Sequence, residues 1–293
     1  MPKRLGAVLR EKMGQRRGML VPGAPNALSA RVVEDLGFEA IYLTGAGIAN
    51  MFLGVPDVGI ISLPELAQHT AAARDVVSLP LIVDADTGFG NAINVGHTVR
   101  TLERAGADAI QVEDQVMPKR CGHFHGKDVI TAGEMTGKVK AAVYARTSED
   151  LLIIARTDVL AIEGVEAAVE RAQLYVEAGA DATFIEAPRS TEEMRAIASH
   201  VGVPQIANMV IGGKTPMLTA DELGQMGFGI VLYANAALQG ALLGMQRTLS
   251  SLKLRGLLTE DDGLVASFKE RQRLVQKDRF DDLERRYSAN EPT

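Results

Sequence analysis

The sequence predicts an α/β protein in which strands and helices alternate eight times and close into a (β/α)8 barrel of the TIM type. Short apolar runs rich in β-branched residues alternate with amphipathic helical stretches along nearly the whole chain. Runs that are apolar at almost every position are typical of parallel strands buried on both faces. Eight such units in about 240 residues fit a closed barrel, and an open doubly wound sheet is the alternative that the pattern leaves.

The predicted strands are short, and a helical stretch follows each of them. The strands are residues 19–22, 40–43, 81–83, 109–112, 152–155, 182–185, 205–207 and 230–233. The helices are residues 26–36, 63–77, 95–105, 132–145, 165–178, 191–200, 219–226 and 236–254. Repeated strand–helix units imply right-handed crossovers and therefore a parallel sheet.

A weak internal repeat supports this order of elements. The tetrapeptide Ala-Gly-Ala-Asp ends at Asp108, before the fourth strand, and again at Asp181, before the sixth. Similar glycine-containing turns, residues 36–39 and 226–229, precede the second and eighth strands. A glycine at such a position can end a helix in the left-handed conformation and turn the chain into the next strand.

We expect a single domain, residues 1–293, with the barrel over about residues 19–254 and a helical tail over about residues 255–293. Between residues 259 and 287 apolar residues recur near helical spacing, which predicts one or two amphipathic helices packed on the barrel or on a neighbouring subunit. The stretch 236–254 carries a long apolar stripe, formed by Leu238, Leu242, Leu243 and Met245. Such a stripe predicts an oligomer, and we expect a homotetramer.

Composition excludes several classes of protein. The net charge of −6 provides no basic footprint for nucleic acid, and no apolar run is long enough to cross a bilayer. The N-terminus reads as a polar, basic stretch without the apolar core of a signal peptide. Cys121 is the only cysteine, so no internal disulfide can form. We therefore expect a cytoplasmic protein without nucleic-acid or membrane partners.

Polar side chains follow six of the predicted strands, and in a parallel barrel such residues point into the mouth of the active site. Single carboxylates after a strand are common turn or cap residues, but several from consecutive strands indicate a site. The residues in these positions are Thr44, Gly45, Ala46, Asp84, Asp86, Glu113, Asp114, Arg156, Thr157, Asp158, Glu186 and Asn208.

Three of these carboxylates suit a hard metal ion. Asp84 and Asp86 are two apart on what we expect to be an extended strand end, so both can face the same side, and Glu113 comes from the adjacent strand. Carboxylate oxygens with room for water favour Mg²⁺, with Mn²⁺ as the alternative, whereas zinc prefers His and Cys. The competing interpretation is that Asp84 or Asp86 caps the next helix.

The connection after the fourth strand, residues 117–127, is polar and basic and contains glycine. Cys121 lies in it between Arg120 and His123. Neighbouring positive charge lowers the pKa of a thiol and makes it a better proton carrier. Because its glycines and charges leave it little to bury, we expect this connection to be mobile and to close on the substrate. A surface loop with an incidental cysteine is the alternative.

At these residues the chain resembles the isocitrate lyase/phosphoenolpyruvate mutase superfamily. The resemblance runs in the family's order from about residue 19 to residue 235, and its most specific element is the Lys-Arg-Cys-Gly-His loop, which is a mobile gating loop in the family. The motifs that carry it are residues 42–45, 54–57, 84–91, 111–115, 118–123, 154–158, 208–210 and 213–216. The family is built on a (β/α)8 barrel whose eighth helix is exchanged between subunits.

The resemblance implies a role for each candidate residue. Asp84 would hold the metal directly, and Asp86 and Glu113 mainly through water. Substrate-binding roles fall to Tyr42, Thr44, Gly45, Ala46, Asp57, Arg156, Gly122, His123, Glu186 and Asn208. Catalytic roles fall to Cys121, His123, Arg120, Lys119 and Tyr42, with Cys121 as the proton donor held by the loop. Tyr42 and a metal-bound water are both candidates for the base.

The expected function is a Mg²⁺-dependent carbon–carbon lyase that cleaves a 2-hydroxy dicarboxylate, giving an α-keto acid and a carboxylate. Members that cleave isocitrate or methylisocitrate commonly read Tyr-Pro-Leu-Ser after the eighth strand, where this chain has Tyr233-Ala234-Asn235-Ala236. The departure weakens methylisocitrate and favours a 2-alkylmalate such as 2,3-dimethylmalate. The alternatives are a carboxyphosphonoenolpyruvate-type phosphonomutase, an oxaloacetate decarboxylase or hydrolase and, more remotely, a non-catalytic binding barrel.

Overall fold

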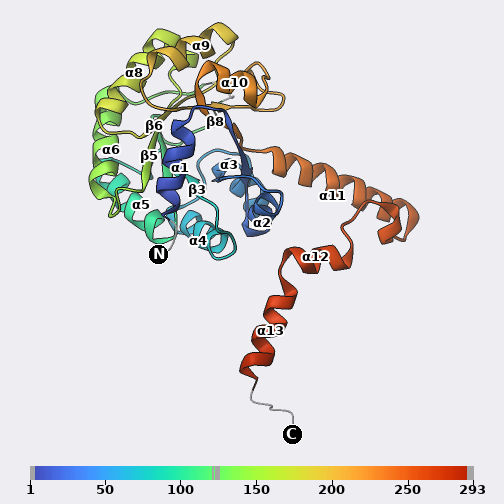
Figure 1. The fold of residues 1–293 in the computed structure, drawn as a ribbon. Coiled ribbons are helices and arrows are strands. Elements are labelled where there is room, and N and C mark those ends of the chain that lie inside the picture. The colour runs from blue at the N-terminus through green and yellow to red at the C-terminus, as the bar shows by residue number, and fades with distance from the viewer. Residues whose placement is uncertain (1–3, 121, 123–125, 289–293) are drawn as a thin grey trace. The chain divides into compact units, whose positions relative to one another are not determined.

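Eight parallel strands close into a barrel in which each strand pairs with its neighbours in chain order and β1 pairs with β8 (Figure 1). This computed structural model describes residues 4–120, 122 and 126–288. The strands are β1 (Met19–Ala24), β2 (Ile41–Leu43), β3 (Leu81–Asp84), β4 (Ala109–Glu113), β5 (Leu152–Thr157), β6 (Ala182–Ile185), β7 (Gln205–Asn208) and β8 (Phe228–Tyr233). The prediction of a closed TIM-type barrel is therefore confirmed, and the open sheet is excluded.

Helices surround the barrel, and most begin at a side-chain cap. They are α2 (Ala27–Asp35), α4 (Leu63–Arg74), α5 (Ala92–Arg104), α6 (Ala132–Ala145), α8 (Val165–Glu177), α9 (Thr191–His200) and α10 (Ala220–Met226). Helix α5 begins three residues before its predicted start, because the side chain of Asn91 accepts hydrogen bonds from the backbone N–H groups of Ile93 and Asn94. Short helical segments α3 (Gly45–Ile48), η1 (Ala49–Leu53) and α7 (Leu160–Glu163) follow strands β2 and β5.

Alternate residues along each strand face the barrel interior and the helices. Tyr42 and Ile82 belong to the interior cluster, while their neighbours Leu43 and Val83 pack in the cluster beneath the helices. Burial on both faces explains why the strands read as continuous apolar runs.

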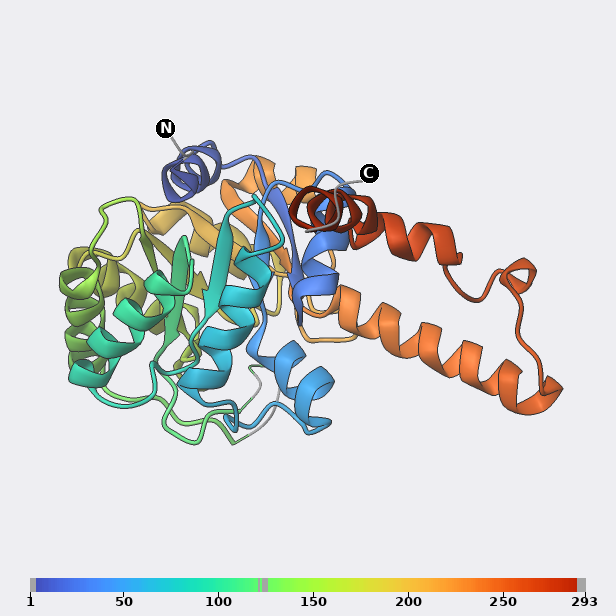
Figure 2. The ribbon, with the colours of Figure 1, turned by 90° about the horizontal axis from the view of Figure 1, so that it is seen from below.

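Helix α1 (Leu5–Gly14) lies at the end of the barrel where the strands begin (Figure 2). Its residues Leu9 and Met13 are fully buried in the interior cluster. A Cβ atom on Gly6 would lie 2.1 Å from the backbone oxygen of Asp150, so the helix approaches that connection closely. The N-terminal stretch expected to be merely polar and basic is thus a helix that covers one end of the barrel.

The repeated Ala-Gly-Ala-Asp turns perform the same task twice. Asp108 Oδ2 accepts a hydrogen bond of 2.9 Å from the backbone N–H of Leu81, at the start of β3. Asp181 Oδ2 accepts one of 2.8 Å from the N–H of Ile153, in β5. In return, the N–H groups of Asp108 and Asp181 donate to the carbonyl oxygens of Leu81 and Ile153. Each aspartate therefore ties the start of one strand to the preceding strand.

The chain divides into two compact units, residues 1–237 and residues 238–293. The second unit contains nearly all of α11 (Ala236–Arg255), the turn η2 (Glu260–Asp262), α12 (Phe268–Leu274) and α13 (Lys277–Tyr287). Helix α11 has no buried residue, although its stripe includes Leu242, Leu243 and Met245. The sequence predicts one or two helices over residues 259–287, and α12 and α13 are present there. The single domain, the packing of the tail, the helix exchange and the tetramer stay predictions.

Among the helices that the structure describes, none combines the length and apolar character needed to cross a bilayer.

Candidate active site

A small cavity lies among the carboxyl ends of the strands. It has a volume of about 50 Å³. Its lining contains nine of the predicted site residues, namely Tyr42, Thr44, Ala46, Asp57, Lys119, Gly122, Arg156, Glu186 and Asn208, together with Asp84 of the predicted metal site. The barrel therefore brings together side chains that are up to 166 positions apart in the sequence.

Asp84 and Asp86 converge on the backbone of Gly45. A Cβ atom on Gly45 would lie 3.2 Å from Asp86 Oδ1 and 3.4 Å from Asp84 Oδ2, so a side chain there would fill the space between the two carboxylates and the β2 connection. The N–H of Gly45 faces Asp84 Oδ2 at 3.4 Å, and Gln111 Nε2 donates to Asp84 Oδ1 at 3.2 Å. The glycine keeps this space open.

Asp86 does not lie on an extended strand end, which corrects the sequence-based geometry. β3 ends at Asp84, and Asp86 has a φ of 48°, in the left-handed region that aspartate tolerates better than most residues. The turn, not the alternation of a strand, brings its carboxylate beside that of Asp84. Burial, with the neighbouring Asp84 and Asp57 carboxylates, raises the pKa of Asp86 to about 7 even though Lys119 lowers it.

Lys119 forms ion pairs with two of the carboxylates. Its Nζ lies 2.5 Å from Asp57 Oδ1 and 2.8 Å from Asp86 Oδ1, and the side chain is 5% exposed. Burial alone would lower the pKa of this ammonium group, but Asp86, Glu113 and Asp57 raise it well above its usual value. The ammonium group is therefore charged, and its ion pairs hold the connection after β4 against the cavity.

Glu113 is buried, and its Oε1 has no hydrogen-bond partner among the described residues. Burial raises its pKa well above the usual range, although Arg156 opposes this effect. Burying a carboxylate oxygen without a hydrogen-bond partner costs free energy, and a bound cation would offset that cost.

The residues Asp84, Asp86 and Glu113 fit Mg²⁺ by donor type and by this partnerless oxygen. Within the described part of the chain, however, no three His, Cys, Asp or Glu side chains are arranged as ligands of one ion. Asp86 is paired with Lys119 instead. The expected metal ligands are thus brought near one another without forming a finished coordination shell, and the metal assignment stays a prediction.

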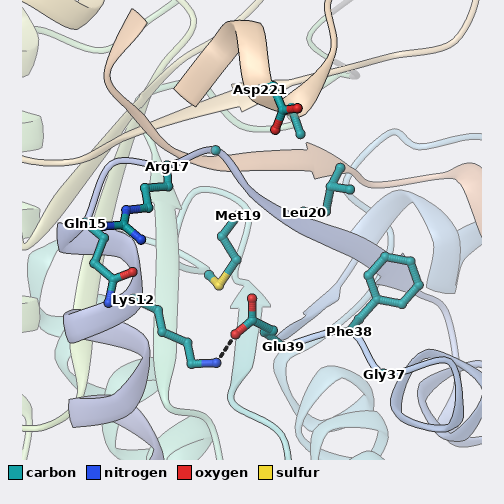
Figure 3. Close-up of a pocket in the computed structure, with 11 residues that line it drawn as sticks. Lys12, Gln15, Arg17, Met19, Leu20, Gly37, Phe38, Glu39 and Asp221 are labelled. Atoms are coloured by element: carbon teal, nitrogen blue, oxygen red, sulfur yellow. Dashed lines mark hydrogen bonds and ion pairs between the residues drawn. The ribbon is translucent and has the colours of Figure 1, made fainter. Parts of the chain in front are cut away.

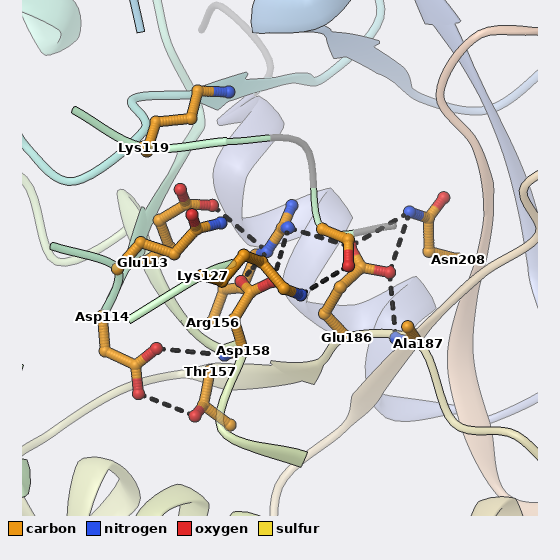
Figure 4. A network of polar contacts seen from close by, with 12 residues as sticks. Glu113, Asp114, Lys119, Lys127, Arg156, Thr157, Asp158, Glu186, Ala187 and Asn208 are labelled. Atoms are coloured by element: carbon orange, nitrogen blue, oxygen red, sulfur yellow. Dashed lines mark hydrogen bonds and ion pairs between the residues drawn. The ribbon is translucent and has the colours of Figure 1, made fainter. Parts of the chain in front are cut away.

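Arg156 forms the centre of a buried ion-pair network (Figure 4). Its Nε lies 2.9 Å from Asp158 Oδ2 and 3.2 Å from Glu113 Oε2, and its Nη2 lies 3.0 Å from Glu186 Oε2. The guanidinium carbon also lies 4.9 Å from the ring centroid of Phe184. A substrate carboxylate would have to compete with these three carboxylates for the guanidinium, and no local sequence pattern predicts these ion pairs.

Glu186 and Asn208 form the adjoining wall, as the order of the strands predicts. Asn208 Nδ2 faces both oxygens of Glu186 at 3.3 and 3.4 Å, and the N–H of Ala187 donates to Oε1 at 2.9 Å. Asn208 Oδ1 is buried and makes no hydrogen bond with the described residues. This oxygen is therefore available to a hydroxyl group in the cavity.

Tyr42 lies on the opposite side, where its hydroxyl donates to Gln111 Oε1 at 3.0 Å. Burial, reinforced by Asp84, raises its pKa well above 10. A phenol that holds its proton so firmly is a hydrogen-bond donor, which argues against Tyr42 as the base.

The connection after β4 is more deeply packed than its composition suggested. Lys119, Gly122 and Lys127 are all buried. A Cβ atom on Gly122 would lie 2.5 Å from Glu186 Cγ and 2.6 Å from Arg156 Nη2, so the backbone rests directly on these two side chains. Arg120 is exposed, and its N–H donates to Gln115 Oε1. Cys121 and His123 lie outside the described residues.

Thr44 and its neighbours close the cavity. Thr44 Oγ1 caps helix α3 by accepting from the N–H of Gly47, and it faces Asn235 Oδ1 at 3.4 Å. The lining also contains residues that sequence reasoning missed, namely Phe184, Val210, Leu232, Ala234 and Asn235. Alternation along β6 and β8 could have identified Phe184 and Leu232, because both point into the barrel.

A larger hollow of about 440 Å³ lies at the opposite end of the barrel (Figure 3). Side chains of both charges line it, and Lys12 pairs with Glu39 there. Active sites of such barrels lie at the carboxyl ends of the strands. The smaller cavity, with its converging carboxylates and perturbed pKa values, is therefore the candidate active site.

The profile of the family described as phosphoenolpyruvate phosphomutase matches residues 9–253. The chain belongs to this family. The match includes every strand of the barrel and every predicted site residue, and it places the protein in the isocitrate lyase/phosphoenolpyruvate mutase superfamily that the loop motif indicated.

Two relatives resemble the chain over most of its length. A 2-methylisocitrate lyase of Aeropyrum pernix is 50% identical over 254 residues, which are 87% of this chain and 82% of that protein. A 2,3-dimethylmalate lyase of Eubacterium barkeri is 40% identical over 283 residues, 97% of this chain and 98% of that protein. Among solved structures, a phosphonopyruvate hydrolase complex with oxalate and Mg²⁺ has a TM-score of 0.86 and 34% identity, covering 96% of this chain and 98% of that one.

Proposed function

We propose that the protein is a Mg²⁺-dependent carbon–carbon lyase that cleaves a 2-hydroxy dicarboxylate carrying small alkyl groups, with 2,3-dimethylmalate as the representative substrate. The chain is a lyase in kind, because relatives at 40–50% identity carry lyase names. The choice among substrates rests on the cavity. The observation that supports this choice is the composition of the cavity, where carboxylates and two buried cations, Lys119 and Arg156, lie next to an apolar wall.

Charge favours a substrate with few carboxylates. The described residues around the cavity supply three more carboxylates than cations: Asp57, Asp84, Asp86, Glu113, Asp158 and Glu186 against Lys119, Lys127 and Arg156. A divalent ion would offset two of these negative charges. A dicarboxylate then adds less repulsion than the tricarboxylate 2-methylisocitrate.

The apolar wall suits alkyl groups. Phe184, Val210, Leu232 and Ala234 line the cavity and offer no charged partner for a third carboxylate. A methyl group placed against such a wall leaves water, and each buried carbon contributes about 0.8 kcal/mol. Both methyl groups of 2,3-dimethylmalate can therefore contribute to binding.

The proposed reaction breaks the C2–C3 bond of the substrate. The C2 hydroxyl gives its proton to a water molecule, the candidate base that remains once Tyr42 is a donor, and becomes the carbonyl of pyruvate. The bonding pair of C2–C3 passes to C3 as a propionate enolate. Mg²⁺, held by Asp84, Asp86 and Glu113, would supply Lewis-acid polarisation of the substrate oxygens. A proton delivered to C3 then completes propionate.

The side chains divide the remaining work. Tyr42, whose phenol stays protonated, turns its single O–H from Gln111 Oε1 to a substrate oxygen near Asp84. Arg156 faces the developing negative charge of the enolate, and Cys121 delivers the proton from the closed loop. Thr44, Gly45 and Ala46 surround the keto-acid end, and Asn208 and Glu186 bind the substrate hydroxyl.

A substrate panel tests this proposal. The purified enzyme is assayed with Mg²⁺ for keto-acid release from 2,3-dimethylmalate and 2-methylisocitrate and for consumption of phosphonopyruvate and oxaloacetate. We expect the largest kcat/KM for 2,3-dimethylmalate. An Asp84→Asn variant prepared in parallel controls for contaminating activity, and an Asp128→Asn variant, changed at an exposed position, controls for the loss of one charge. A larger kcat/KM for phosphonopyruvate would instead identify a phosphorus–carbon enzyme.

A further inference from the structure

Lys127 connects the loop after β4 to the base of the active site. Its side chain is 3% exposed, and its Nζ lies 2.7 Å from Asp158 Oδ1 (Figure 4). The same Nζ donates to the carbonyl oxygen of Gly122. One ammonium group therefore bridges the loop backbone and a carboxylate that follows β5.

Asp158 in turn holds Arg156. Its Oδ2 accepts from Arg156 Nε at 2.9 Å, and its Oδ1 accepts from Arg156 Nη2 at 3.3 Å while also contacting Lys127. Burial alone would raise the pKa of Asp158, but Arg156 and Lys127 lower it to about 2, so the carboxylate is ionised. The two cations share one fully buried anion.

Asp114 holds the backbone of Asp158 in place. The N–H of Asp158 donates to Asp114 Oδ1 at 3.0 Å, and Asp114 Oδ2 accepts from the hydroxyl groups of Thr157 at 2.7 Å and Tyr175 at 2.9 Å. Arg171 also pairs with Asp114 and donates to the carbonyl oxygen of Ile130, just beyond the loop. Asp158 is thus part of the rigid barrel, to which Lys127 ties the loop.

We propose that Lys127 is a positioning residue. Its ammonium group holds the backbone of Gly122 against Arg156 and Glu186, and so fixes the position of the connection after β4 relative to the Arg156 guanidinium. Gly122 has no space for even a Cβ atom, so this packing requires the loop backbone at one position. A flexible polar loop would not keep such a position without a buried tie. The effect on turnover rests on the proposed lyase activity, whereas the effect on the loop does not.

The test compares Lys127→Met with Lys140→Met, which makes the same change at an exposed lysine of helix α6. Two measurements are made on the full-length protein: kcat/KM for 2,3-dimethylmalate, and the rate of cleavage after Arg120 by an arginine-specific protease. We expect Lys127→Met to lower kcat/KM by about 10- to 150-fold, the range for losing a hydrogen bond to a charged group, and to accelerate cleavage by a similar factor. The expected urea midpoint is close to that of the wild type.

The Lys127→Arg variant keeps the positive charge. It should therefore recover most of the kcat/KM lost in Lys127→Met and slow proteolysis after Arg120 toward the wild-type rate. Unchanged cleavage and kcat/KM in Lys127→Met would overturn the proposal. A fall in the urea midpoint that matches the loss of kcat/KM would also overturn it, since that result indicates a merely structural role. If the wild-type enzyme does not cleave 2,3-dimethylmalate, the proposed function fails. The rates of proteolysis after Arg120 still decide whether Lys127 holds the loop.

Discussion

Replacing Gly122 with alanine tests the closed packing of the loop. The added Cβ would lie 2.5 Å from Glu186 Cγ, 2.8 Å from Glu186 Cδ and 2.6 Å from Arg156 Nη2. Neither side chain can easily withdraw, because Glu186 is held by Ala187 and Arg156, and Arg156 is held by Glu113 and Asp158. The added methyl group must therefore displace the loop backbone.

The cost of such overpacking is typically about 1–3 kcal/mol. If the closed loop is needed for catalysis, kcat/KM should fall by the corresponding factor of about 5 to 150. Gly122 is not among the residues with a positive φ, so alanine adds no backbone strain and the loss is steric. We expect stability to change little, because the substitution displaces the loop backbone and leaves the packing of the barrel unchanged.

The assay measures initial rates of keto-acid release from 2,3-dimethylmalate at saturating Mg²⁺, together with urea unfolding. Gly137→Ala is the matched control, because a Cβ there meets no atom within 4 Å and alanine favours its helix by about 0.5–1 kcal/mol. The control should keep its kcat/KM and gain slightly in stability. A kcat/KM for Gly122→Ala within twofold of the wild-type value would refute the closed packing.

Four further predictions follow from the site and the fold. Cys121→Ser should lower kcat by about a hundredfold or more with little change in the inhibition constant of a keto acid, since the hydroxyl is a far weaker acid; near-normal kcat would remove Cys121 from the chemistry. Asp84→Ala should abolish Mg²⁺ binding measured by calorimetry and Glu113→Gln should weaken it less, so equal losses would contradict water-mediated contact at Glu113. Light scattering at micromolar concentration should give a tetramer, whereas a monomer would contradict the oligomer expected from the α11 stripe. Asp181→Ala should lower the free energy of unfolding by about 1–3 kcal/mol without changing kcat, because it leaves the N–H of Ile153 unpaired far from the cavity, and an unchanged urea midpoint would argue against the tie.

The strands of the barrel could be predicted from the sequence because burial on both faces leaves a local signal. Helix α1 could not, because only Leu9, Met13 and Gly6 of its ten residues are buried, and its charges dominate the pattern. Asp84 and Arg156, chosen because they follow strands, line the cavity, and Glu113 pairs with Arg156 beside it, since the parallel topology alone brings strand ends together.

The ion pairs that these side chains form could not be predicted from the sequence. Arg156 faces three protein carboxylates, and Lys119 reaches across to Asp57, 62 positions away. Such contacts depend on side-chain conformation and on how the loop folds back, neither of which has a periodic signal. Lys127 was overlooked for the same reason, because a lysine in a polar loop ordinarily faces water.

Carbon–carbon cleavage is tested most directly by NMR of the products formed from 2,3-dimethylmalate in D₂O with Mg²⁺. The proposed reaction predicts pyruvate and propionate in equal amounts, with a single deuterium at C2 of propionate where the enolate takes its proton. Intact 2,3-dimethylmalate under conditions in which the enzyme consumes phosphonopyruvate would contradict the lyase assignment.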